Sequence, residues 1–99
     1  MRVRLTPESQ ADVAEARLWY RQRGTGLDRR FLDSVEACLS SISEHPERGL
    51  VVEGTIRRLL LRGFPYGVFY TLYPNEAVVI ACLHGARSPQ AWGRRGARS

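Results

Sequence analysis

Three apolar runs of strand length within residues 56–92 decide the fold: IRRLLLR (56–62), FPYGVFY (64–70) and VVIACLH (78–84). Gly63-Phe64-Pro65 and Pro74-Asn75 separate them, and these residue types are typical of turns. We therefore predict a three-stranded antiparallel meander. Arginines in the first run and tyrosines in the second predict one polar, basic and aromatic-rich face. The rest of the chain is expected to cover the other face.

The residues before the meander predict a short strand and two helices. Residues 2–5 alternate polar and apolar side chains, which suits a half-buried strand. Thr6 and Pro7 are suited to the N-cap and the first helical position, and Gly24-Thr25-Gly26 is expected to end this helix. Asp28 is expected to cap a second helix that stops before His45-Pro46. Apolar residues recur along it at spacings of three and four, namely Leu27, Phe31, Val35, Cys38 and Ile42.

The predicted order is β-α-α-β-β-β, an α+β fold in which a helical hairpin covers one face of an antiparallel sheet. The N-terminal strand is expected to join this sheet beside the strand at 64–70 or the strand at 78–84. Residues 51–53 are expected to extend the first meander strand. Residues 1–92 are expected to form a single domain, and residues 93–99 a basic, flexible tail.

Composition fits one domain with its own core. The chain has 99 residues, of which 43% are hydrophobic and 25% charged. Cys38 and Cys82 lie in apolar runs without the spacing of metal ligands, so we expect buried free thiols, no metal and no cofactor. The apolar run at 77–83 is too short to span a membrane. No leader is recognisable, so a cytoplasmic protein without a membrane partner is expected.

Charge is divided unevenly along the chain. The formal net charge is +5, and all fifteen basic residues are arginine. Residues 1–53 hold eight arginines against nine acids, whereas residues 54–99 hold seven arginines against one acid, Glu76. Such segregation indicates a surface for a polyanion or an acidic protein segment. The alternative is that the arginines only keep a small domain dispersed in water.

Several motifs, taken in order, resemble one family. They are ADVxxAxxWY at 11–20, RFLxxVE at 30–36, HPxxG at 45–49, IRR at 56–58, FPYxxxY at 64–70 and HxxRxPxxW at 84–92. Together they are similar to the RelE/ParE superfamily of toxins from bacterial type II toxin–antitoxin modules. The likeness is to the ParE-like side, which includes plasmid stabilisation proteins. It covers nearly the whole chain.

This resemblance implies a growth-arresting toxin and a cognate antitoxin that wraps it with an acidic segment. It also implies one of two targets. RelE-like members cut mRNA in the ribosome, whereas ParE-like members poison DNA gyrase without being enzymes. The leading interpretation for this chain is gyrase inhibition, and the alternative is ribosome-dependent mRNA cleavage. A second alternative is a non-toxic nucleic-acid-binding or interaction module.

A ribonuclease would need an acid or base and cations on the scissile phosphate. Histidine exchanges protons near neutral pH, and guanidinium matches phosphate with two parallel hydrogen bonds. The candidate catalytic residues are therefore His84, Arg87, Arg62 and Tyr70. No lysine is present, and no tyrosine or acid follows His84. This departs from the ribonuclease members and weakens the nuclease interpretation.

Candidate residues for binding the target or another anion are arginines. Neighbouring positions on a strand face opposite sides of the sheet, so one of Arg57 and Arg58 is expected to bond to its own domain. Arg87, directly after the last strand, is the better candidate for an exposed functional arginine. The full set is Arg57, Arg58, Arg62, Arg87, Arg94 and Arg95.

Overall fold

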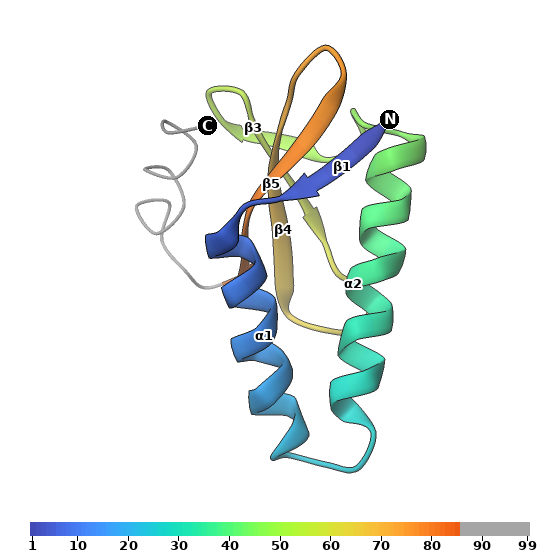
Figure 1. The fold of residues 1–99 in the computed structure, drawn as a ribbon, viewed down its shortest axis with the longest axis vertical. Coiled ribbons are helices and arrows are strands. Elements are labelled where there is room, and N and C mark those ends of the chain that lie inside the picture. Colours follow the sequence, from blue (N-terminus) through green and yellow to red (C-terminus); the bar gives the residue numbers. More distant parts are fainter. Residues whose placement is uncertain (86–99) are drawn as a thin grey trace.

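In the described part of the chain, two helices pack as an antiparallel hairpin on one face of a five-stranded sheet (Figure 1). The computed structural model describes residues 1–85. The predicted α+β fold with a helical hairpin is confirmed. The elements in chain order are β1 (Arg2–Leu5), α1 (Pro7–Arg21), α2 (Leu27–Glu44), β2 (Leu50–Glu53), β3 (Ile56–Leu60), β4 (Tyr66–Leu72) and β5 (Glu76–His84).

The sheet has the strand order β1-β5-β4-β3-β2. Strands β2 to β5 pair antiparallel, as the meander predicts. However, β1 lies parallel to β5, so the sheet is mixed and not purely antiparallel. The expected extension of the first meander strand is also wrong. Residues 50–53 form a strand of their own because Gly54 adopts a φ of 53° and reverses the chain before β3.

The N-cap residues explain where the two helices begin. Pro7 is the first residue of α1, and the Thr6 hydroxyl accepts a hydrogen bond from the backbone N–H of Ser9 at 3.2 Å, as predicted. Asp28 does not cap α2. Gly26 is the N-cap with a φ of 78°, and no side chain caps the helix. The left-handed glycine starts the helix two residues early, and Asp28 falls within the first turn.

Apolar residues lie on both faces of the sheet. The inner cluster joins the helices to the sheet through Phe31, Ile42, Tyr70 and Val79. The outer cluster contains Ile56, Phe69, Val78, Ile80, Ala81 and Leu83, all at most 6% exposed. A register shift between Phe69 and Tyr70 lets both Ile80 and Ala81 belong to the outer cluster. The expected polar, basic face is therefore wrong.

Because the Cys38 and Cys82 thiols are buried, we expect the free energy of unfolding to fall at alkaline pH. Burial raises the pKa of the Cys38 thiol to about 11 and that of Cys82 to about 12, whereas an unfolded cysteine titrates near pH ~8.5. The unfolded chain therefore loses these protons first, so the stability present below pH ~8.5 falls as the pH rises. We expect urea unfolding to require less urea at about pH 9.5 than at about pH 8.

The control is a variant in which Cys38→Ala and Cys82→Ala are combined, since it lacks both thiols. Its stability should fall less over the same interval, which ends before most tyrosines ionise. Equal falls in the two proteins would contradict a role for the thiols.

Candidate functional site

Tyr70 is a structural residue in the core. Its side chain is 0% exposed, and its hydroxyl donates to the Pro46 carbonyl at 2.7 Å. The same hydroxyl accepts from the backbone N–H of Gly49 at 2.9 Å. Burial raises its pKa, although the Gly49 hydrogen bond and Arg57 oppose the shift. This position anchors the loop before β2.

Arg57 and Arg58 have different roles, as their neighbouring positions predict. Arg57 Nη1 donates to the carbonyls of Glu47 and Gly49 at 3.0 and 2.8 Å, so this guanidinium supports the same loop as Tyr70. Arg58 pairs with Phe69 on β4, a residue of the outer cluster. Its aliphatic stem lies within 3.2 Å of the position that a Cβ on Gly67 would occupy. Arg57 is thus committed to the fold, whereas Arg58 lies on the outer face; both side chains are half-buried.

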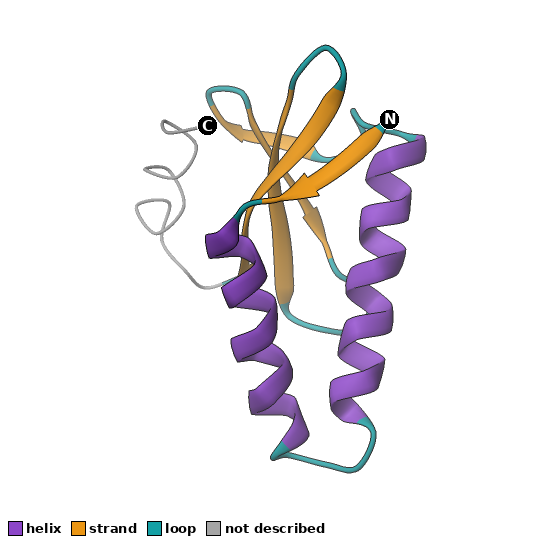
Figure 2. Ribbon diagram, viewed as in Figure 1, coloured by secondary structure: helices purple, strands orange, loops and turns teal. Residues whose placement is uncertain are grey.

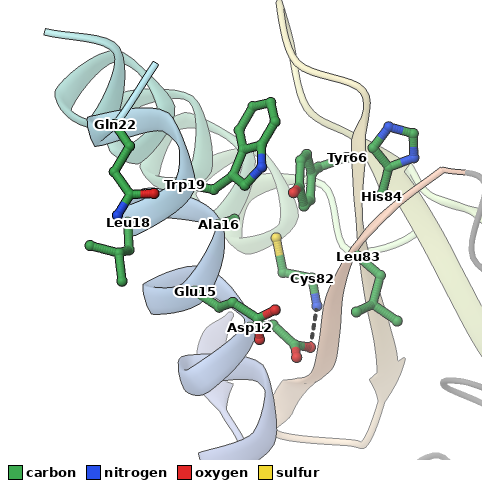
Figure 3. A pocket seen from close by; sticks show the side chains of 10 residues that line it. All are labelled: Asp12, Glu15, Ala16, Leu18, Trp19, Gln22, Tyr66, Cys82, Leu83 and His84. Atoms are coloured by element: carbon green, nitrogen blue, oxygen red, sulfur yellow. Dashed lines mark hydrogen bonds between the residues drawn. The ribbon is translucent and has the colours of Figure 1, made fainter. Parts of the chain in front are cut away.

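A hollow of about 380 Å³ lies between α1 and the end of β5 (Figure 3). We call it the α1–β5 hollow. Asp12 Oδ2 accepts from the backbone N–H of Cys82 at 3.0 Å, and the Tyr66 and His84 rings meet edge to face at 5.6 Å. Within residues 1–85 its charged lining is acidic, which does not favour a phosphate. The described lining residues are Asp12, Glu15, Ala16, Leu18, Trp19, Gln22, Tyr66, Cys82, Leu83 and His84.

Among the described candidate ribonuclease residues, His84, Arg62 and Tyr70 do not lie together at one point. His84 ends β5 and lines the α1–β5 hollow, while Arg62 follows β3 and lines a different hollow beside α2. Strand β4 runs between β5 and β3, so the backbones of these two strands are about 10 Å apart in the sheet. Arg87, Arg94 and Arg95 lie outside the described residues, as does the predicted boundary at residue 92.

A second hollow, of about 580 Å³, lies between α2 and β3. We call it the α2–β3 groove. Ser34 on α2 closes one end by donating to the Arg62 carbonyl at 2.8 Å, and Arg48 Nη1 donates to Ser41 Oγ at 2.7 Å. The charged residues among its described lining are two arginines, Arg48 and Arg62, and one carboxylate, Asp33. These are Asp33, Ser34, Ala37, Cys38, Ser41, Arg48, Leu59, Leu60 and Arg62.

An exposed apolar strand edge borders the α2–β3 groove. β2 is an edge strand and pairs only with residues 56–58, so within residues 1–85 no strand lies beside Leu59 and Leu60 on that side. Leu50, Val51 and Leu60 are 71%, 55% and 60% exposed. Exposed apolar side chains on an unpaired edge are typical of a protein-binding surface. This surface was not predicted from the sequence, because residues 51–53 were expected to extend the strand at 56–62.

Within residues 1–85, no group of three His, Cys, Asp or Glu side chains could hold a metal ion. In the same part of the chain, no helix combines the length and apolar content needed to cross a membrane.

The fold has a counterpart of known structure. A chain in the solved structure "Chromosomal ParDE TA system from P. aeruginosa" matches with a TM-score of 0.69 and 13% sequence identity. The match covers 85% of the present chain and 95% of that one. At this identity the likeness shows the fold, which is that of a small α+β protein with a helical hairpin on a mixed sheet.

Sequence comparison gives the family. The family model for the ParE toxin of the type II toxin-antitoxin system, parDE, matches residues 3–89. The chain therefore belongs to the ParE toxin family. No curated protein sequence matches the chain.

Proposed function

We propose that this ParE-family chain arrests growth by inhibiting DNA gyrase without cutting RNA. The observation that supports this choice is the separation of the candidate nuclease residues. His84 and Arg62 line different hollows, Tyr70 is buried, and the fourth candidate, Arg87, lies outside the described residues. Acid–base cleavage of RNA needs such groups within hydrogen-bonding reach of one substrate. A protein that binds and inhibits an enzyme does not.

A supercoiling assay with purified gyrase tests the proposal. The full-length chain should block supercoiling of relaxed plasmid at near-stoichiometric ratios, and it should leave mRNA intact in a ribosome-dependent translation reaction. Unimpaired supercoiling together with cleaved mRNA would overturn the proposal in favour of the RelE-like alternative. If neither activity appears, the chain is better described as a non-toxic interaction module.

We further propose that an antitoxin neutralises the chain by binding the α2–β3 groove and the adjoining edge of the sheet. An extended segment could add a strand beside Leu59 and Leu60, because main-chain pairing to an open edge is a common mode of peptide recognition. Apolar side chains of that segment would cover Leu50 and Leu60. Its acidic side chains would face Arg48 and Arg62, which line the groove. A neighbouring gene is expected to encode this antitoxin.

Leu60→Glu is expected to weaken antitoxin binding about tenfold or more. The substitution removes an exposed apolar contact and places a negative charge where an acidic segment would lie. Leu18→Glu is the matched control, because Leu18 is similarly exposed at 55% but lies on α1. Titration calorimetry with the product of the neighbouring gene measures both. Unchanged affinity for Leu60→Glu, or an equal loss for the control, would place the antitoxin elsewhere.

A further inference from the structure

The positive charge of the described residues is concentrated at the turn of the helical hairpin. Residues 17–30, which we call the hairpin tip, carry five arginines and one acid, Asp28. All other residues in 1–85 carry six arginines and nine acids. A comparison of residues 1–53 with residues 54–99 does not show this concentration of arginines, because the acids before and after the tip offset its positive charge. The tip is therefore a basic surface on an otherwise slightly acidic described domain.

All five arginines of the hairpin tip are exposed. Figure 2 shows both helices extending past the strands on the side of the turn, so the tip projects from the sheet. Arg17 and Arg21 line a shared hollow with Asp28, and the Arg23 guanidinium lies 4.1 Å from the centre of the Trp19 ring. Arg29 pairs with Asp33 at 3.3 Å, but both side chains are largely exposed, at 75% and 60%. Such a pair is screened by water and leaves the arginine able to exchange partners.

Stability alone does not account for this arrangement. Arg21 suits the last turn of α1, where the helix dipole is negative. Arg29 and Arg30 occupy the first turn of α2, where the dipole is positive and a cation is unfavourable. Arg17 and Arg21 are also four residues apart, a spacing at which like charges repel. The tip thus keeps unfavourable cations on a solvent-exposed surface.

We propose that the hairpin tip binds the phosphate backbone of duplex DNA. The axes of packed helices lie about 8–10 Å apart. Arginine side chains are long, so guanidinium groups on two such helices can be as far apart as the two sides of a DNA major groove, which is about 12 Å wide. Guanidinium groups on both helices can therefore contact phosphates on both sides of one groove. This inference goes beyond gyrase inhibition and does not depend on it.

A docked acidic protein segment fits the tip less well. Specific protein interfaces have an apolar, water-excluding centre. At the tip, the large exposed apolar side chains are Leu18 and Trp19, both on α1. Arg23 lies over the ring of Trp19. On the α2 side, the exposed residues of the tip are Arg29 and Arg30. Phosphate contacts need only such cations.

Fluorescence anisotropy with a labelled, random-sequence DNA duplex tests the inference on the purified full-length chain. The test variants are Arg17→Gln/Arg21→Gln and Arg29→Gln/Arg30→Gln. Each should weaken binding about tenfold or more and lower the slope of log affinity against log salt by about 2. The matched control is Arg2→Gln/Arg4→Gln, which removes two arginines from β1 at the opposite end of α1. Its salt slope should stay near that of the unmodified chain.

Three outcomes would overturn the inference. The first is the absence of DNA binding at low salt. The second is an equal loss in the tip variants and in the β1 control, which would indicate net charge alone. The third is tip-dependent binding of a poly-glutamate peptide without binding of DNA, which would indicate an acidic protein as the partner. Circular dichroism should show unchanged folding, because the substituted side chains are exposed. Gyrase inhibition is measured in the separate supercoiling assay, so a failure of DNA binding and a failure of gyrase inhibition can be told apart.

Discussion

Phe31→Ala is expected to lower the free energy of unfolding by about 3–5 kcal/mol, which is the usual cost of removing a buried phenylalanine ring. Phe31 is 0% exposed and lies at the centre of the aromatic cluster that fixes the hairpin to the sheet. Its ring centre is 5.2 Å from Tyr20 on α1, 5.3 Å from Phe64 in the turn before β4 and 5.3 Å from Tyr66 on β4. Alanine would leave a cavity between these three rings, which the surrounding side chains fill only in part.

Urea unfolding followed by circular dichroism measures this loss. Leu18→Ala is the control, because Leu18 is 55% exposed and should change stability by less than about 0.5 kcal/mol. Domains of this size are stable by about 5–15 kcal/mol, so Phe31→Ala removes a large share and also loosens Tyr66 beside His84. A loss below about 1 kcal/mol would contradict the assigned packing.

Gly49→Ala is expected to destabilise the protein by about 3 kcal/mol, through overpacking and lost hydrogen bonds. A Cβ at this position would lie 2.6 Å from the Tyr70 hydroxyl and 3.0 Å from the Arg58 carbonyl. Tyr70 cannot move away, because the same hydroxyl bonds to Pro46 and to the Gly49 N–H. The backbone carbonyl of Arg58 belongs to β3 and is equally constrained. The loop must therefore shift and break at least one of these bonds.

Gly24→Ala is the matched control for this substitution. There the nearest atom to a new Cβ is the end of the flexible Leu27 side chain, at 3.0 Å, so rotation of that side chain relieves the contact. Thermal unfolding should show a much larger decrease in melting temperature for Gly49→Ala than for Gly24→Ala. Similar decreases would show that the close approach of Gly49 to Tyr70 is not required. Tyr70→Phe should also destabilise the protein, since it leaves the Gly49 N–H and the Pro46 carbonyl without this partner.

Most of the fold could be predicted from local sequence signals. Thr6-Pro7 specified the start of α1, the apolar spacing around Phe31 specified the buried face of α2, and the turns at 63–65 and 74–75 separated the strands. The errors lie where local signals were weak or misleading. Asp28 is a good capping residue, but the left-handed Gly26 started α2 earlier. Residues 50–53 form a separate strand because Gly54 turns the chain. A single glycine is a weak sequence signal for a turn, so this turn was not predicted.

The candidate site was harder to predict than the fold. Residue type suggested catalytic or anion-binding roles for Tyr70 and Arg57, but their partners are the carbonyls and N–H of the loop at 46–49, earlier in the chain. No sequence spacing encodes such contacts. The expected polar face is wrong because the run at 77–83 is apolar at every position, so β5 presents apolar side chains to both faces of the sheet. The basic hairpin tip was not predicted, because residues 1–53 have a net charge near zero although five arginines gather at 17–30.

We propose that this ParE-family chain stops growth through DNA gyrase. The most direct measurement is pulse-labelling of DNA and protein synthesis within minutes of inducing the chain alone in a bacterial host. We predict an early fall in DNA synthesis, with a DNA-damage response, while protein synthesis continues. Co-expression of the antitoxin should restore DNA synthesis. An early fall in protein synthesis with DNA synthesis intact would contradict the account and point to mRNA cleavage.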